Sequence, residues 1–293
     1  MATFPRRKAK NNVSQAPKVS RFKRFTQRRM RAASDASPMR KTFQRRGIYL
    51  LPNAFTTAAL FCGFYAIVMA MNQRFEPAAV AIFIAMILDG LDGRIARLTN
   101  TQSEFGAQYD SLSDMVSFGA APALVVYEWS LRGMDKLGWL AAFVYCAGAA
   151  LRLARFNTNI EVVDKRYFQG LPSPAAAALV AGFVLLMEDL RIGGTDLRWV
   201  SWSITLLAGL TMVTNVPFYS FKDINFKKSV PFIAVFLIVL GIVAVASDAP
   251  KVLFGLFVFY GLSGYAIFLW RMLKGKPVSI VQTTEDDDHD HLD

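Results

Sequence analysis

The chain has 293 residues, of which 54% are hydrophobic, and its formal net charge is +11. Long apolar runs and a positive mean hydropathy exclude an ordinary soluble domain and indicate an integral membrane protein. The charge is uneven, because residues 1–46 hold 15 of the 33 Lys and Arg residues while the stretch from Glu285 onward is acidic. The excess of positive charge therefore lies mainly in the N-terminal arm, residues 1–46, and not in the body of the chain.

The basic arm, residues 1–46, mixes Lys and Arg with Ser, Gln and Ala and has no apolar core of its own. We expect it to be disordered or to lie on the membrane surface. Residues 21–31 resemble a nucleic-acid patch, but a basic arm beside a membrane segment has a simpler role in holding the N-terminus inside and contacting anionic lipid. We therefore expect membrane lipids, and no nucleic acid, as its partners. No apolar signal-peptide core precedes residue 47.

Eight apolar segments predict an all-α fold, a polytopic membrane helix bundle over residues 47–275 with an acidic flexible tail at 276–293. With the N-terminus inside, the loops on that side carry twelve Lys and Arg residues and the opposite loops carry six, which fits the positive-inside rule. Both termini are then expected in the cytoplasm. The predicted segments are 50–71, 77–97, 106–130, 137–156, 172–188, 198–217, 230–247 and 251–273.

Four aspartates interrupt the second and third apolar segments. Asp89 and Asp92 are three residues apart and Asp110 and Asp114 are four apart, so each pair shares one face of a helix. If the polar link 98–105 reverses the chain, both pairs lie at similar depth. A carboxylate at membrane depth costs roughly 2.5–3.5 kcal/mol, so four of them need compensation, as a bound cation would provide. Oxygen ligands favour Mg²⁺, Mn²⁺ or Ca²⁺ over zinc.

The residues next to the acids suit a phosphate ligand. Gly93 and Gly106 have no side chain and leave room for a close approach, and Arg97 lies one helical turn beyond Gly93 with planar donors for phosphate. Magnesium is usually completed by substrate phosphate oxygens, and two ions can clamp the attacking and leaving oxygens. The sequence therefore predicts a metal site, open to the cytosol, for a substrate that carries both phosphate and lipid.

The acidic motif resembles the signature of the CDP-alcohol phosphotransferase family, with every defining position filled: Asp89-x2-Asp92-Gly93-x2-Ala96-Arg97-x8-Gly106-x3-Asp110-x3-Asp114. That family comprises helical membrane enzymes that move a phosphatidyl or related group from a CDP-linked donor to an alcohol with the help of divalent cations. The predicted number of helices and several further stretches resemble its phosphatidylserine synthase branch: Pro52-Asn53 with Thr56, Arg152–Asn157, Phe168–Pro174 and Pro217–Lys222.

The resemblance implies the roles of the site residues. The four aspartates would bind Mg²⁺ or Mn²⁺, as two ions, and Asp114 would also be the general base. It would take the proton from the hydroxyl of L-serine as that oxygen attacks the lipid-side phosphorus of CDP-diacylglycerol, and CMP would leave. The resemblance also implies a homodimer in the inner membrane of a bacterium. The nucleotide side would be lined by Gly93, Ala96, Arg97, Gly106, Asn53 and Thr56.

The acceptor site is inferred from the residues. A serine carboxylate favours a bidentate arginine, and Arg152 and Arg155 share a face near the inner end of the fourth segment. Tyr219 and Ser220 are candidate hydroxyl partners for the ammonium or the phosphate. Simpler roles stay open, because the two arginines also suit membrane anchoring and Asn53 also suits a helix N-cap.

Two other functions stay open. Glycerol 3-phosphate, inositol phosphate or choline could be the acceptor, although a phosphate-bearing acceptor would favour more basic residues around the third and fourth segments. A cation-coupled transporter could use the acids as an ion pathway. Transporters place their sites near the bilayer midplane between repeated halves, whereas this sequence shows no repeat and its acids cluster toward one face.

Overall fold

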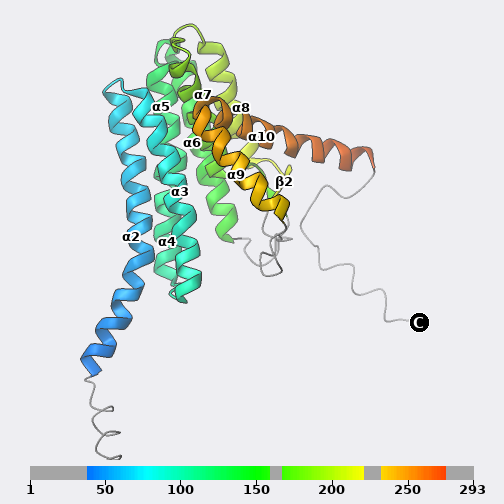
Figure 1. The fold of residues 1–293 in the computed structure, drawn as a ribbon. Coiled ribbons are helices and arrows are strands. Elements are labelled where there is room, and N and C mark those ends of the chain that lie inside the picture. Colours follow the sequence, from blue (N-terminus) through cyan, green and yellow to red (C-terminus); the bar gives the residue numbers. More distant parts are fainter. Residues whose placement is uncertain (1–37, 159–166, 221–231, 275–293) are drawn as a thin grey trace, which may run out of the picture. The chain divides into compact units, whose positions relative to one another are not determined.

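The computed structural model describes residues 38–158, 167–220 and 232–274 (Figure 1). Contacts divide the chain into two units, Met1–Ile48 and Tyr49–Asp293, and the second contains the helix bundle. The predicted acidic tail and most of the predicted basic arm lie outside the described residues, as does Lys222.

The regular structure of the described chain consists of helices and two short strands, joined by turns and loops. The helices are α2 (Pro38–Met71), α3 (Phe75–Thr99), α4 (Glu104–Asp114), the π-helix η1 (Met115–Ala120), α5 (Ala121–Trp129), the 3₁₀-helix η2 (Leu131–Met134), α6 (Asp135–Thr158), α7 (Ser173–Asp189), α8 (Arg198–Val213), α9 (Phe232–Ser247) and α10 (Ala249–Leu273). The strands are β1 (Tyr167–Gln169) and β2 (Pro217–Tyr219). Each of the eight predicted segments contains a helix, and α4, η1 and α5 follow one another within the third.

Helix α2 extends upstream to Pro38, and its apolar stretch Pro52–Met71 confirms the predicted membrane segment 50–71. The prediction was wrong at the end of α8. Helix α8 ends at Val213 and not at 217, because Val216 precedes a proline and is biased toward extended backbone. The chain from Pro217 to Tyr219 instead pairs antiparallel with β1. The fold is therefore a helix bundle with one two-stranded ribbon and is not wholly α-helical.

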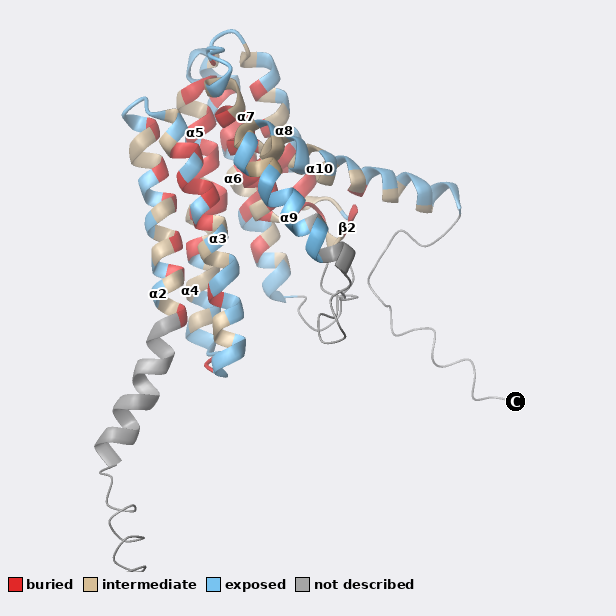
Figure 2. Cartoon of the chain, in the orientation of Figure 1, coloured by how far each residue is buried: buried red, intermediate tan, exposed pale blue. Residues whose placement is uncertain are grey.

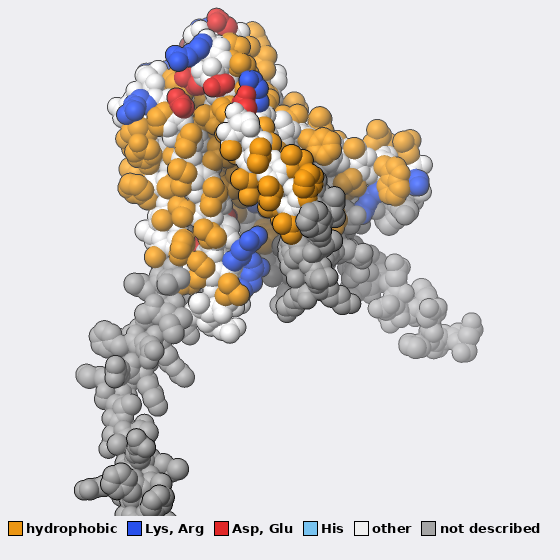
Figure 3. Space-filling view, viewed as in Figure 1, with side chains coloured by type: hydrophobic (Ala, Val, Ile, Leu, Met, Phe, Trp, Pro, Cys, Tyr) orange, Lys and Arg blue, Asp and Glu red, His pale blue; other side chains and the backbone are white. Residues whose placement is uncertain are grey.

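Three described stretches are long and apolar enough to cross a membrane: Pro52–Met71, Leu131–Thr158 and Ala249–Leu273. Large apolar side chains are exposed along α2, α3, α9 and α10, and Figure 3 shows hydrophobic side chains along the visible sides of the helices, with charged ones gathered toward their ends. Such a surface fits hydrocarbon and not water. The protein is an integral membrane protein.

The core is built around α7. Pro172 and Pro174 start this helix, where a missing N–H costs nothing, and its run Ala175–Ala178 is buried. Small side chains let neighbouring helices approach closely, and α7 contacts α3, α5, α8 and α10. Figure 2 shows buried residues concentrated in α5 and α7, whereas α9 and most of α10 are exposed or half-buried.

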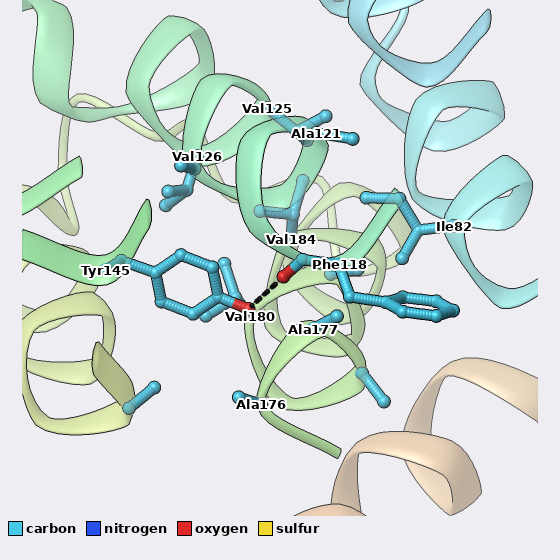
Figure 4. Close-up of a cluster of buried hydrophobic side chains, with 14 of the residues drawn as sticks. Ile82, Phe118, Ala121, Val125, Val126, Tyr145, Ala176, Ala177, Val180 and Val184 are labelled. Carbon is cyan, nitrogen blue, oxygen red and sulfur yellow. Dashed lines mark hydrogen bonds between the residues drawn. The ribbon is translucent and has the colours of Figure 1, made fainter. Parts of the chain in front are cut away.

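The π-helix η1 lies between α4 and α5, and a proline helps to explain it. Pro122 has no N–H, so it cannot donate to the carbonyl of Phe118, four residues earlier, as an α-helix requires. The buried hydroxyl of Tyr145 donates to that carbonyl instead, at 3.1 Å (Figure 4). A side chain of α6 therefore satisfies the backbone where the helix changes its winding.

Candidate active site

The polar link between α3 and α4 reverses the chain. Asn100 ends α3 in the left-handed conformation, which asparagine tolerates, with φ 51°. Ser103 then caps α4, and its hydroxyl accepts from the N–H of Gly106 at 3.0 Å. The second half of α3 and the second half of α4 therefore carry their aspartates at the same end of the bundle.

Three of the four predicted aspartates meet in one cluster. Asp89 and Asp92 of α3 and Asp110 of α4 each offer an oxygen, and these oxygens lie within 4.8 Å of one another. Asp92 is buried and the other two are half-buried. Asp114 follows one turn after Asp110 and interacts with Asp89 and Asp110. The folded chain thus brings together carboxylates that are up to 25 positions apart in the sequence.

The cluster fits a divalent cation. Oδ1 of Asp110 and Oδ1 of Asp114 are buried and have no hydrogen-bond partner among the described residues. Unpaired carboxylate oxygens are costly in an apolar setting unless a cation neutralises them. All the donors are carboxylates, which suit a hard ion of the Mg²⁺ or Mn²⁺ type.

The predicted nucleotide-side residues differ in their exposure and in the space around them. Gly93 is exposed, with open space where a side chain would stand, and Arg97 is exposed in the last turn of α3. Ala96 is half-buried beside it. A Cβ on Gly106 would lie 3.1 Å from Oγ of Ser103, the cap of α4, and 3.6 Å from Oδ1 of Asn53 in α2, which is an ordinary contact distance.

Thr56 has a different surrounding, because its side chain is buried behind the acids. Only 4% of this residue is exposed, and its hydroxyl donates to Oδ2 of Asp92 at 2.7 Å. The sequence predicted that Thr56 contacts the nucleotide, and it did not indicate the hydrogen bond from Thr56 to Asp92.

The two candidate arginines have different hydrogen-bond partners. Arg152 donates to the buried hydroxyl of Ser173 at 2.6 Å and is attracted by Asp114. Arg155 donates to the carbonyls of Val213, at 2.8 Å, and Thr214, at 3.4 Å, and to the amide of Asn215. Arg155 therefore caps the C-terminus of α8, where helix carbonyls lack partners, while Arg152 faces the acidic cluster.

The end of β2 is connected to the surroundings of Arg152 through α10. Tyr260 of α10 interacts electrostatically with Arg152, and its hydroxyl donates to the carbonyl of Tyr219 at 3.2 Å. Oγ of Ser220 is buried and has no partner within the described chain. Ser173 and Tyr260 were missed in the sequence, because a serine between two prolines indicates a helix start and a tyrosine in an apolar run indicates packing.

The fold and the site define a helical membrane protein with a buried carboxylate cluster between two helices. The model of the CDP-alcohol phosphatidyltransferase family matches residues 49–216. The chain is 37% identical over 232 residues to a CDP-diacylglycerol–serine O-phosphatidyltransferase of Helicobacter pylori, covering 78% of this chain and 96% of the relative.

Proteins of two further organisms give similar matches. A protein of the same name from Mycobacterium tuberculosis is 34% identical over 210 residues, covering 69% of this chain and 72% of the relative. One from Saccharomyces cerevisiae is 33% identical over 192 residues, covering 61% and 62%. The chain belongs to the CDP-alcohol phosphatidyltransferase family, as the aspartate motif predicted.

Proposed function

We propose that this protein transfers the phosphatidyl group of CDP-diacylglycerol to the hydroxyl of L-serine, forming phosphatidylserine and CMP. The observation that carries the proposal is the meeting of carboxylates from α3 and α4, within 4.8 Å, in a chain whose relatives bear the serine O-phosphatidyltransferase name. A membrane-embedded acidic cluster suits a donor that is both a lipid and a diphosphate.

In this proposal the four aspartates hold two divalent ions, Mg²⁺ or Mn²⁺. When bound, such ions neutralise charge on the diphosphate and on the departing CMP. The residues Gly93, Ala96, Arg97, Gly106 and Asn53 form the nucleotide side, where the exposed guanidinium of Arg97 attracts phosphate and the open space at Gly93 admits it. Thr56 belongs to this side through Asp92, to which its hydroxyl donates.

Asp114 is the proposed general base. Its Oδ1 is buried and unpaired among the described residues, so it is free to accept the proton of the serine hydroxyl. As the serine oxygen forms its bond to the lipid-side phosphorus, the bond from that phosphorus to CMP breaks and the electron pair leaves with CMP. The guanidinium of Arg152 interacts electrostatically with Asp114 and so belongs to the surroundings of the proposed base.

Arg152 is also the proposed ligand of the serine carboxylate. Its bond to Ser173 engages one nitrogen and leaves other donors of the guanidinium for a bidentate contact. Arg155 supports the serine site only indirectly in this proposal, because its guanidinium already binds carbonyls at the end of α8. Tyr219 and Ser220 complete the acceptor side, and Tyr260 connects their segment to Arg152.

The decisive experiment measures CMP release by the purified protein in detergent with CDP-diacylglycerol, Mn²⁺ or Mg²⁺, and labelled acceptors. We expect CMP release that requires L-serine, with the label recovered in phosphatidylserine. Glycerol 3-phosphate, inositol phosphate and choline serve as competing acceptors. Turnover with one of these alcohols and not with serine would show that the proposed acceptor is wrong. The absence of CMP release with every alcohol tested would contradict the proposed chemistry.

We also propose that the catalytic membrane domain spans residues 47–275 in the inner membrane of a bacterium, with the site and both termini toward the cytoplasm. Leu98 lies in the last turn of α3, near the site, and is 82% exposed, whereas Arg132 lies in η2, beyond α5. A membrane-impermeant thiol reagent on intact cells should label Arg132→Cys and spare Leu98→Cys, in a background without Cys62 and Cys146. The reverse pattern would invert the orientation.

A homodimer is proposed as well. Its test is the mass of the purified protein in detergent, measured by light scattering. A mass of two chains supports the dimer, and a mass of one chain contradicts it.

A further inference from the structure

The hydroxyl of Thr56 is placed between two acceptors. It lies 2.7 Å from Oδ2 of Asp92 in α3 and 3.2 Å from the carbonyl of Pro52 in its own helix, α2. A hydroxyl has one proton to donate, and the shorter contact goes to the charged acceptor, which forms the stronger bond. Thr56 is 4% exposed and Asp92 is 5% exposed, so water does not compete for this bond.

The backbone of the same residue contacts the other acidic helix. The buried hydroxyl of Ser113, next to Asp114, donates to the carbonyl of Thr56 at 3.1 Å. One turn further on, Ser117 donates to the carbonyl of Ala59, also at 3.1 Å. Thr56 therefore touches α3 with its side chain and α4 with its carbonyl, and it lies between the two pairs of aspartates.

The approach of α2 to η1, which continues directly from α4, is close. A Cβ added to Gly63 would lie 2.6 Å from Oγ and 2.7 Å from Cα of Ser117, distances that real side chains do not adopt. Only glycine lets the two backbones come this near. The position of Thr56 is thus fixed by packing as well as by its own hydrogen bonds.

We propose that Thr56 is a positioning residue that orients Asp92 for a divalent cation and sets its place relative to the aspartates of α4. Carboxylates that bind metals are themselves held by hydrogen bonds, which fix their orientation before the metal arrives. The bond from Thr56 restrains one oxygen of Asp92 and leaves the other for the ion. This inference rests on the proposed function, because it requires that the cluster binds a metal, and it gives Thr56 an indirect role in place of a nucleotide contact.

The test is the binding of Mn²⁺ to the purified protein in detergent, without CDP-diacylglycerol, followed through the electron paramagnetic resonance signal of free Mn²⁺. Thr56→Val removes the hydroxyl and keeps the shape, and we expect it to weaken Mn²⁺ binding about 10-fold, the scale seen when a metal ligand loses its hydrogen-bond partner. Thr56→Ser keeps the hydroxyl and should bind Mn²⁺ nearly as tightly as the wild type.

Thr205→Val is the matched control. Thr205 is fully buried in α8, and its hydroxyl donates to the carbonyl of Ser201 at 2.7 Å, far along the chain from the acids. Its replacement removes a buried threonine hydroxyl from a helix and should leave Mn²⁺ binding unchanged. Thermal unfolding in metal-free buffer reports whether each variant folds, and Thr56→Ala provides a second hydroxyl-free variant should Thr56→Val unfold.

Each outcome separates this inference from the proposed function. Wild-type affinity in Thr56→Val would overturn the inference and leave the metal site intact. An equal loss in Thr56→Ser and Thr56→Val would also overturn it, because the hydroxyl would not be the cause. A wild-type protein that binds no Mn²⁺ would remove the proposed metal site and the inference together.

Discussion

The two ends of the bundle use their buried polar groups in different ways. At the end formed by Trp129 and the last turn of α7, the indole N–H donates to Glu188 at 2.7 Å, and the hydroxyl of Ser130 donates to the carbonyl of Gly194 at 2.7 Å. At the acidic end, Asp110 and Asp114 keep buried oxygens without partners among the described residues.

This difference separates stability from function. Paired buried groups stabilise a fold, whereas unpaired ones cost free energy and persist where a ligand completes them. At the first end Nε of Arg198 is also unpaired within the described chain, but the acidic end combines its unpaired oxygens with several carboxylates close together. Changes to the clustered carboxylates should therefore alter catalysis, and changes to the paired groups at the other end should alter stability.

Removal of divalent ions should have the largest effect. We expect a chelator to abolish CMP release and added Mn²⁺ or Mg²⁺ to restore it, because the clustered carboxylates would hold the ions that neutralise the charge of the diphosphate. The measurement is CMP release before chelation, after it and after readdition of each ion. Full activity in the chelated protein would show that the unpaired oxygens serve another purpose.

Asp114→Asn should have the second-largest effect on activity. It keeps the shape of the side chain and removes the proposed base, so turnover should fall by at least about 100-fold while thermal unfolding stays close to that of the wild type. CMP release at saturating serine measures the effect. Turnover near the wild-type level would remove Asp114 from the role of base without touching the family assignment.

The two arginines sharpen the comparison within one helix. Arg152→Gln should raise the KM for serine by about 10-fold or more, since a charged hydrogen bond to the carboxylate is lost. Arg155→Gln should instead lower the unfolding temperature, because its contacts with Val213 and Thr214 hold the end of α8. Initial rates over a range of serine concentrations and melting curves in detergent distinguish them. If Arg155→Gln instead raised the KM for serine and Arg152→Gln lowered the unfolding temperature, the serine carboxylate would bind at Arg155.

Trp129→Phe should have the smallest effect on activity. It removes the bond to Glu188 and keeps most of the packing against Phe183, so we expect a loss of about 1 kcal/mol in unfolding free energy and an unchanged kcat/KM. Paired melting curves and rate measurements check it. A marked fall in kcat/KM would mean that the two ends of the bundle are coupled.

The fold and the acids could be predicted because their signals are local. Charged residues are rare in apolar membrane segments, so the aspartates stand out, and the polar link 98–105 indicates the turn that Asn100 and Ser103 form. The helices follow from long apolar runs, although their ends move by several residues.

The remaining details depend on distant partners. Spacing places Arg152 and Arg155 on one face, but long side chains reach different elements, and the sequence does not say that one meets Ser173 and the other meets α8. The ribbon of β1 and β2 pairs residues about fifty positions apart through only three residues each, which is too short for an alternating pattern. Pro217 was the one available sign that α8 ends early.

The π-helix η1 has a consequence for how this site varies. An α-helix turns by about 100° per residue, so the widened turn sets the rotational phase of the acid-bearing α4 separately from that of α5 in the core. Loss of a single residue between Met115 and Ala120 would re-aim Asp110 and Asp114 while the core kept its register. The winding of six residues thus decides the direction in which two carboxylates point.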